Sequence, residues 1–141
     1  DADSGLVHTV IGTAANVADV TQAAALLHGQ ESDAWGDAGY QGVDKRKECE
    51  GSVVRWEVAM RPGKRRRLDP ARELDRLREK AEKLKASIRA KVEHPFRVVK
   101  QQFGYAKVRY RGLAKNTARL TMLFALGNLW MVRARLLAMQ A

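Results

Sequence analysis

Arg89, Glu93 and Lys100 have the residue types and spacing of a site that handles charge. On an α-helix of about 3.6 residues per turn they fall on one face, and an apolar stripe runs beside them. One carboxylate, a ligand type that Mg²⁺ accepts, would then be flanked by cations next to a surface that can be buried. An ordinary solvated helix face, with an Arg–Glu pair worth about a few tenths of a kcal/mol, has the same spacing. The spacing alone therefore leaves both interpretations open.

A second acid, Asp37, follows a short stretch that can form a strand, and the glycines around it force a turn. Open α/β sheets build their sites at the carboxyl ends of strands, so Asp37 is a candidate site residue. Alternatively, its side chain forms an Asx-turn with the backbone of Gly39 and has only a structural role. The local sequence does not decide between these alternatives.

Two motifs resemble the DDE transposases of bacterial insertion sequences. The order Arg89, three residues, Glu93, six residues, Lys100 resembles the family signature Tyr-(2)-Arg-(3)-Glu-(6)-Lys around the last catalytic acid, with Ala86 at the tyrosine position. The neighbouring Val-Glu-His-Pro-Phe-Arg at 92–97 is also similar. Gly-Asp-Ala-Gly-Tyr-Gln-Gly at 36–42 resembles the segment that carries the second catalytic Asp. Residues 13–19 and 109–116 are similar as well, so the resemblance covers nearly the whole chain.

This resemblance implies an RNase H-like sheet whose three acids hold two divalent ions, Mg²⁺ or Mn²⁺, for phosphodiester hydrolysis and DNA strand transfer. Asp37 would be the second catalytic and metal-binding acid, and Glu93 the third. The first Asp is expected on a strand upstream of residue 1, because Asp1 and Asp3 occupy a turn and are poor substitutes. By the same resemblance, Arg89 would orient Glu93 or hold a phosphate, and Lys100 would contact DNA.

The charge of the chain is unevenly distributed. Residues 1–60 hold ten acids and four bases, net −6, whereas residues 61–141 hold six acids and twenty-two bases, net +16. This asymmetry favours a polyanionic partner, although a solvated basic protein has the same charge. Two basic segments, 64–67 and 105–112, either contact DNA or are solvated linkers. In the second segment bases alternate with tyrosines, a pattern that suits contacts with both the backbone and the bases of DNA. The candidate DNA contacts, besides Arg89 and Lys100, are Arg97, Lys64, Arg65, Arg66, Arg67, Lys107, Arg109 and Arg111.

The patterns predict an α/β fold: a partial RNase H-like fold lacking its first strands, with a long kinked helix and a buried C-terminal helix. Strands are expected at 6–12, at 33–36 and at 53–60, and helices at 16–28 and 43–50. A helix at about 70–103 should kink at Pro95 and carry a leucine stripe that packs on the sheet or on a coiled-coil partner. Residues 1–141 are read as the C-terminal portion of one catalytic domain, divided into 1–60, a basic loop at 61–68, and a helical part at 69–141.

Composition places this domain inside the cell. The single cysteine, Cys49, indicates a reducing compartment and an ordinary small side chain rather than a nucleophile. The longest apolar-rich run, 120–132, is short and interrupted for a membrane span. We therefore expect a cytoplasmic, nucleoid-associated protein that binds double-stranded DNA, namely transposon ends and target, as a homodimer when full length. The alternatives are a truncated, non-catalytic fragment that binds DNA or pairs with a transposase, and an unrelated basic helical protein in which both acids are structural.

Overall fold

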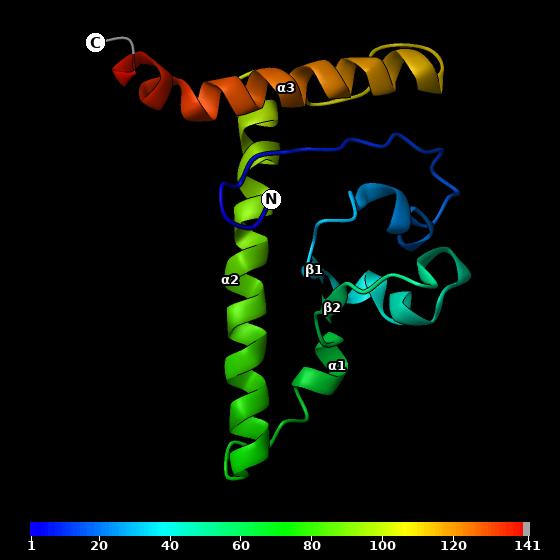
Figure 1. Ribbon diagram of the computed structural model, residues 1–141, viewed down its shortest axis with the longest axis vertical. Coiled ribbons are helices and arrows are strands. Elements are labelled where there is room, and N and C mark those ends of the chain that lie inside the picture. Colours follow the sequence, from blue (N-terminus) through cyan, green and yellow to red (C-terminus); the bar gives the residue numbers. More distant parts are fainter. Residues whose placement is uncertain (140–141) are drawn as a thin grey trace. The chain divides into compact units, whose positions relative to one another are not determined.

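The computed structural model describes residues 1–139 and divides into two compact units. Unit 1 combines Asp1–Asn16 with Lys91–Ala141, and unit 2 is Val17–Ala90. Helices dominate, and the strands form a small parallel sheet, an architecture compatible with the predicted α/β class. Figure 1 shows the order of the elements along the chain.

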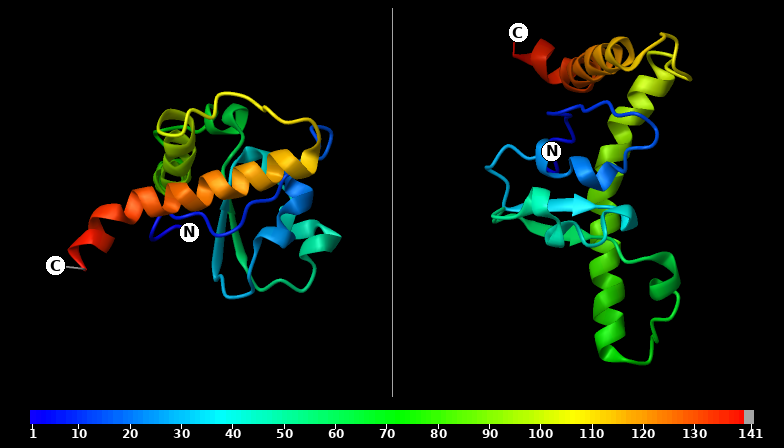
Figure 2. Two further views of the ribbon diagram at one scale, coloured as in Figure 1. Left: turned by 90° about the horizontal axis from the view of Figure 1, so that it is seen from above. Right: turned by 90° about the vertical axis from the view of Figure 1, so that its right-hand side faces the viewer.

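The sheet of unit 2 consists of β1 (Asp33–Gly36) and β2 (Arg55–Val58), which run parallel and side by side (Figure 2). Their register pairs Asp33 with Arg55 and Gly36 with Val58. Both strands were predicted, although β2 is shorter than the expected 53–60. Trp56 and Val58 pack against a small core cluster, which consists of Ala23, Val43 and Cys49. The Cys49 side chain is buried there.

The helices predicted at 16–28 and 43–50 are wrong in type. The structure has short 3₁₀ helices at Asp19–Gln22 and Ala24–Leu26, and again at Val43–Lys45 and Lys47–Cys49. In the first pair the apolar residues Val20, Ala23 and Leu26 recur every three positions. A 3₁₀ helix places such residues on one face, and this geometry brings Ala23 into the core cluster.

Helix α1 (Pro62–Arg65) replaces part of the basic loop predicted at 61–68. Pro62 occupies the first helical turn, where its missing N–H costs nothing. Helix α2 (Glu73–Gln101) starts later than predicted and continues through Pro95 without a break. Its leucine stripe does not pack on the sheet, because Leu74, Leu77 and Leu84 are each more than half exposed.

The strand predicted at 6–12 is absent; this segment is extended but has no partner strand. It lies instead against α3 (Leu113–Ala138), within unit 1. The side chain of Asn128 takes the place of a strand by accepting a hydrogen bond from Val7 N at 2.9 Å and donating one to Val7 O at 2.7 Å. A β-branched sequence therefore finds its backbone partners on a helix here.

Helix α3 is less buried than predicted, since only Phe124 and Gly127 are fully covered in it. Phe124 packs edge-on against Phe96 with ring centroids 5.1 Å apart, and Gly127 faces Val98 and Val99. Gly127 therefore lies at a contact between α3 and α2. Within residues 1–139, α3 is the one helix long and apolar enough to cross a membrane by length and composition, a test that core helices of soluble proteins also pass.

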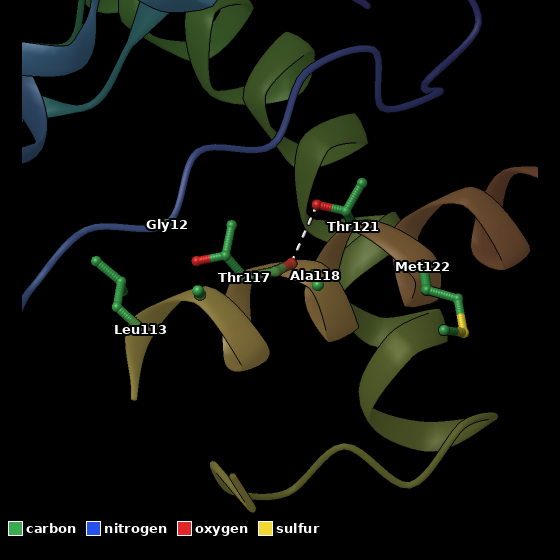
Figure 3. A pocket seen from close by; sticks show the side chains of 7 residues that line it. Gly12, Leu113, Thr117, Ala118, Thr121 and Met122 are labelled. Carbon is green, nitrogen blue, oxygen red and sulfur yellow. Dashed lines mark hydrogen bonds between the residues drawn. The ribbon is translucent and has the colours of Figure 1, made fainter. Parts of the chain in front are cut away.

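Gly12 lies directly over α3, and its lack of a side chain makes this approach possible (Figure 3). A Cβ at this position would lie 2.0 Å from Thr117 Oγ1 and 2.9 Å from Thr117 Cβ. We expect Gly12→Ala to destabilise unit 1 by about 1–3 kcal/mol through overpacking, measured by urea unfolding. Adding Thr117→Ala should recover part of the loss, whereas Gly63→Ala, where an added Cβ meets nothing within 4 Å, should cost little. Equal unfolding midpoints for Gly12→Ala and the wild type would contradict this packing.

Candidate functional site

Asp37 stands at the carboxyl end of β1, as predicted, with an exposed side chain. It caps the 3₁₀ helix Ala38–Tyr40 by accepting a hydrogen bond from Gly39 N on Oδ1, at 2.7 Å. The Asx-turn interpretation and the site interpretation are therefore compatible, because this turn uses one carboxylate oxygen. Burial raises the pKa of the neighbouring Tyr40 phenol, and the charges of Asp19 and Asp37 raise it further.

Asp37 lines a cavity of about 370 Å³ that lies entirely within unit 2. The half-buried Arg89 of α2 lines the same cavity. No residue within 17–90 forms a hydrogen bond or ion pair with the Arg89 guanidinium, so it can take an anion. The structure thus brings together one acid and one cation that the sequence had identified at positions 52 residues apart.

Glu82 lines this cavity too, and the sequence analysis did not identify it. It is the one charged side chain fully buried among residues 1–139, with 6% exposure. Its Oε2 accepts a hydrogen bond from Met60 N at 2.8 Å, and its Oε1 lies 3.6 Å from Lys85 Nζ. Lys85 also donates to Val58 O. These contacts fix the segment after β2 to helix α2, so they hold two walls of the cavity together.

Arg65, predicted to contact DNA, already has a partner inside unit 2. Its guanidinium donates to both oxygens of Glu79, at 2.9 and 2.7 Å. These hydrogen bonds lower the pKa of the Glu79 carboxyl and raise that of Arg65. The neighbouring cations Lys64, Arg66 and Arg67 are exposed. A phosphate would therefore meet their charges more readily than that of Arg65.

The remaining candidates belong to unit 1, where Glu93 and Lys100 are exposed on α2. Arg97 is exposed as well and donates to Gln101 Oε1 at 3.1 Å. Lys107, Arg109 and Arg111 are exposed in the loop that connects α2 with α3. Asp37 belongs to unit 2, whereas these candidates belong to unit 1.

Within residues 1–139 no three His, Cys, Asp or Glu side chains form a metal-binding group. Mg²⁺ usually takes only one or two protein carboxylates and keeps several waters. Asp37 fits such a role, because it is exposed and its turn occupies a single oxygen. Glu82 does not fit, because a backbone N–H and a lysine already occupy its two oxygens.

Asp37 thus lies where open α/β sheets place their sites, and Arg89 in the same cavity is a side chain that can bind a phosphate. The family described as "Transposase DDE domain" matches residues 1–129, and the chain belongs to this family. No solved structure matches the chain.

Proposed function

We propose that this chain forms part of a DNA transposase that hydrolyses phosphodiesters and transfers DNA strands at insertion-sequence ends. Membership of the transposase family supports this assignment. The observation that carries it at residue level is the shared cavity of Asp37 and Arg89 within unit 2. In this proposal Asp37 and Glu93 are the catalytic acids and the metal ligands, on an RNase H-like sheet.

Asp37 and Glu93 would each offer carboxylate oxygens to Mg²⁺ or Mn²⁺, with two ions in the complete site. Such ions, when bound, stabilise the attacking and leaving oxygens of an in-line displacement. Arg89 would bind the phosphate that carries the scissile bond, because it lines the cavity of Asp37. Glu82 would keep that cavity in shape through its contacts with Met60 N and Lys85.

The exposed cations would bind double-stranded DNA, both transposon ends and target, through its phosphates. Lys100 and Arg97 would bind DNA on the helix that carries Glu93. Lys64, Arg66 and Arg67 would form a second contact, in which Arg65 takes part only if it leaves Glu79. We further propose that the full-length protein is a homodimer, located in the cytoplasm with the nucleoid and not in a membrane.

A second candidate is a non-catalytic DNA-binding or transposase-pairing product. The exposed basic residues favour it independently of the acids, because they need no metal to bind DNA. The test is a nicking and strand-transfer assay with the full-length protein on supercoiled DNA carrying insertion-sequence ends. Cleavage with Mg²⁺ that EDTA abolishes supports the transposase; DNA binding without any cleavage in Mg²⁺ or Mn²⁺ supports the second candidate.

A further inference from the structure

The loop at 104–112, between α2 and α3, has a defined shape although it contains no helix or strand (Figure 2). Asn116, in the first turns of α3, bonds it at two points. The amide oxygen accepts from Tyr110 N at 3.2 Å, and the amide nitrogen donates to Tyr110 O and Gly112 O, both at 2.6 Å. One side chain therefore fixes the backbone where the loop enters the helix.

Arg119 holds the same loop from one turn further along α3. Its guanidinium carbon lies 5.5 Å from the ring centroid of Tyr105 and 5.4 Å from that of Tyr110. Contacts of this kind are worth about 0.5–1 kcal/mol each at exposed sites and more where water is excluded. Arg119 and Tyr105 are half-buried, so these contacts link the beginning and the end of the loop.

The cations of this loop have no acidic neighbours in the surrounding sequence. Residues 94–141 contain nine Lys and Arg residues and no Asp or Glu. Lys107, Arg109 and Arg111 are exposed, and Tyr110, which contacts Arg119, lies between the last two. A positive surface without carboxylates attracts a polyanion rather than forming internal ion pairs.

We propose that residues 105–112 form a preformed clamp for the phosphates of duplex DNA, and that Asn116 and Arg119 are its positioning residues. The proposal rests on the proposed function for the identity of the polyanion. Lys107, Arg109 and Arg111 each neutralise one phosphate, independently of base sequence. The rings of Tyr105 and Tyr110 contact Arg119, so they shape the loop and do not stack on bases.

A loop that is already ordered before DNA binds should have a higher affinity for DNA than a flexible one. Ordering a flexible side chain at an interface costs about 0.5–1.5 kcal/mol, and a loop that is already fixed avoids part of this cost. Asn116 carries no charge and its amide is bonded to Tyr110 and Gly112, so we expect it to affect DNA binding through loop geometry. This property separates a positioning role from a direct electrostatic one.

The experiment measures binding of the full-length protein to labelled duplexes of two unrelated sequences, by fluorescence anisotropy over a salt series without divalent ions. Replacing Lys107, Arg109 and Arg111 together by Gln should make the negative slope of log binding constant against log salt concentration shallower by about 2.7, that is about 0.9 per phosphate. The loss should be equal for both sequences. An unchanged slope would overturn the clamp.

Asn116→Ala should weaken binding about 10-fold and lower the slope, while thermal unfolding of the protein stays cooperative. It should also speed trypsin cleavage after Arg109 and Arg111, because the loop loses its fixed shape. Arg119→Gln should act likewise, and Arg119→Lys should keep more affinity. The matched control is Arg133→Gln, which removes the same charge and a comparable contact, with Trp130 at 3.9 Å, further along α3. The positioning role is wrong if Asn116→Ala binds DNA with wild-type affinity. It is also wrong if Arg119→Gln loses no more affinity than Arg133→Gln.

Binding to single-stranded DNA tests the alternative that the tyrosines stack on bases. If the tyrosines stacked on bases, Tyr110→Leu would weaken binding to single strands selectively; we expect similar losses on single and double strands. Because the assay contains no divalent ion, a failure of catalysis leaves its result unaffected. Asp44→Asn, which lies outside both the cavity and this loop, should bind as the wild type does.

Discussion

Replacing Asp37 by Asn, or Glu93 by Gln, lowers the rate of Mg²⁺-dependent DNA cleavage by the full-length protein more than about 100-fold. Even the outer partners of metal ligands cost about 10- to 100-fold when removed, and a direct ligand costs more. Asn at position 37 can still accept the hydrogen bond from Gly39 N, so the turn is kept while the charge is lost. The measurement is single-turnover nicking at saturating DNA, together with DNA affinity, which should stay close to that of the wild type.

Asp44→Asn is the matched control for this prediction. Asp44 is exposed in a 3₁₀ helix of the same unit and lies outside the cavity, so the variant should cleave at the wild-type rate. If cleavage survives both Asp37→Asn and Glu93→Gln, the catalytic assignment of these acids is wrong. If only one of the two variants keeps the wild-type cleavage rate, the residue replaced in that variant is not a metal ligand.

Glu82→Leu should destabilise unit 2 by about 2–3 kcal/mol. The change leaves Met60 N–H without its acceptor and removes a carboxylate from beside Lys85. Lys85 keeps its contacts with Glu57 and Val58 O, which limits the loss. Urea unfolding followed by tryptophan fluorescence measures it, because Trp56 packs against the core cluster of unit 2.

Glu79→Gln provides the comparison, since Glu79 lies one turn away on the same helix and is also ion-paired. Its pair with Arg65 is about one-third exposed on both sides, so removing the charge should change stability little. Glu82→Gln should fall between the two variants, because an amide oxygen can still accept from Met60 N. Equal unfolding midpoints for Glu82→Leu and Glu79→Gln would show that burial of Glu82 has no energetic role.

The elements that were predicted well are those determined by residues close to one another in the sequence. β1 and the turn at Asp37 follow from a short apolar stretch and from glycines that end it, and the alternation around Trp56 predicted β2. Long helices were also predicted, because their charge and leucine periodicity extends over many turns. The first residue of α2 was missed, because Asp69 caps a separate turn by accepting from Ala71 N before α2 begins.

The failures depend on partners that are distant in sequence. Nothing around Val7 indicates that Asn128 will bond its backbone, so a β-branched segment was assigned to a sheet. The burial of α3 was overestimated because apolar composition does not say which face meets another element. In the candidate site, motif resemblance identified Asp37 and Arg89, whereas no sequence pattern indicated Glu82. A glutamate on a charged helix becomes distinctive only when a backbone N–H 22 residues away points at it.

The position of Cys49 gives this protein a built-in reporter. It is the sole thiol of the chain, and it lies beneath Val43 and Ala23 rather than at the surface. A thiol reagent can reach this sulfur only after the surrounding 3₁₀ turns have opened. The rate of its alkylation therefore measures local opening of the core cluster against which Tyr40 packs, with no engineered label.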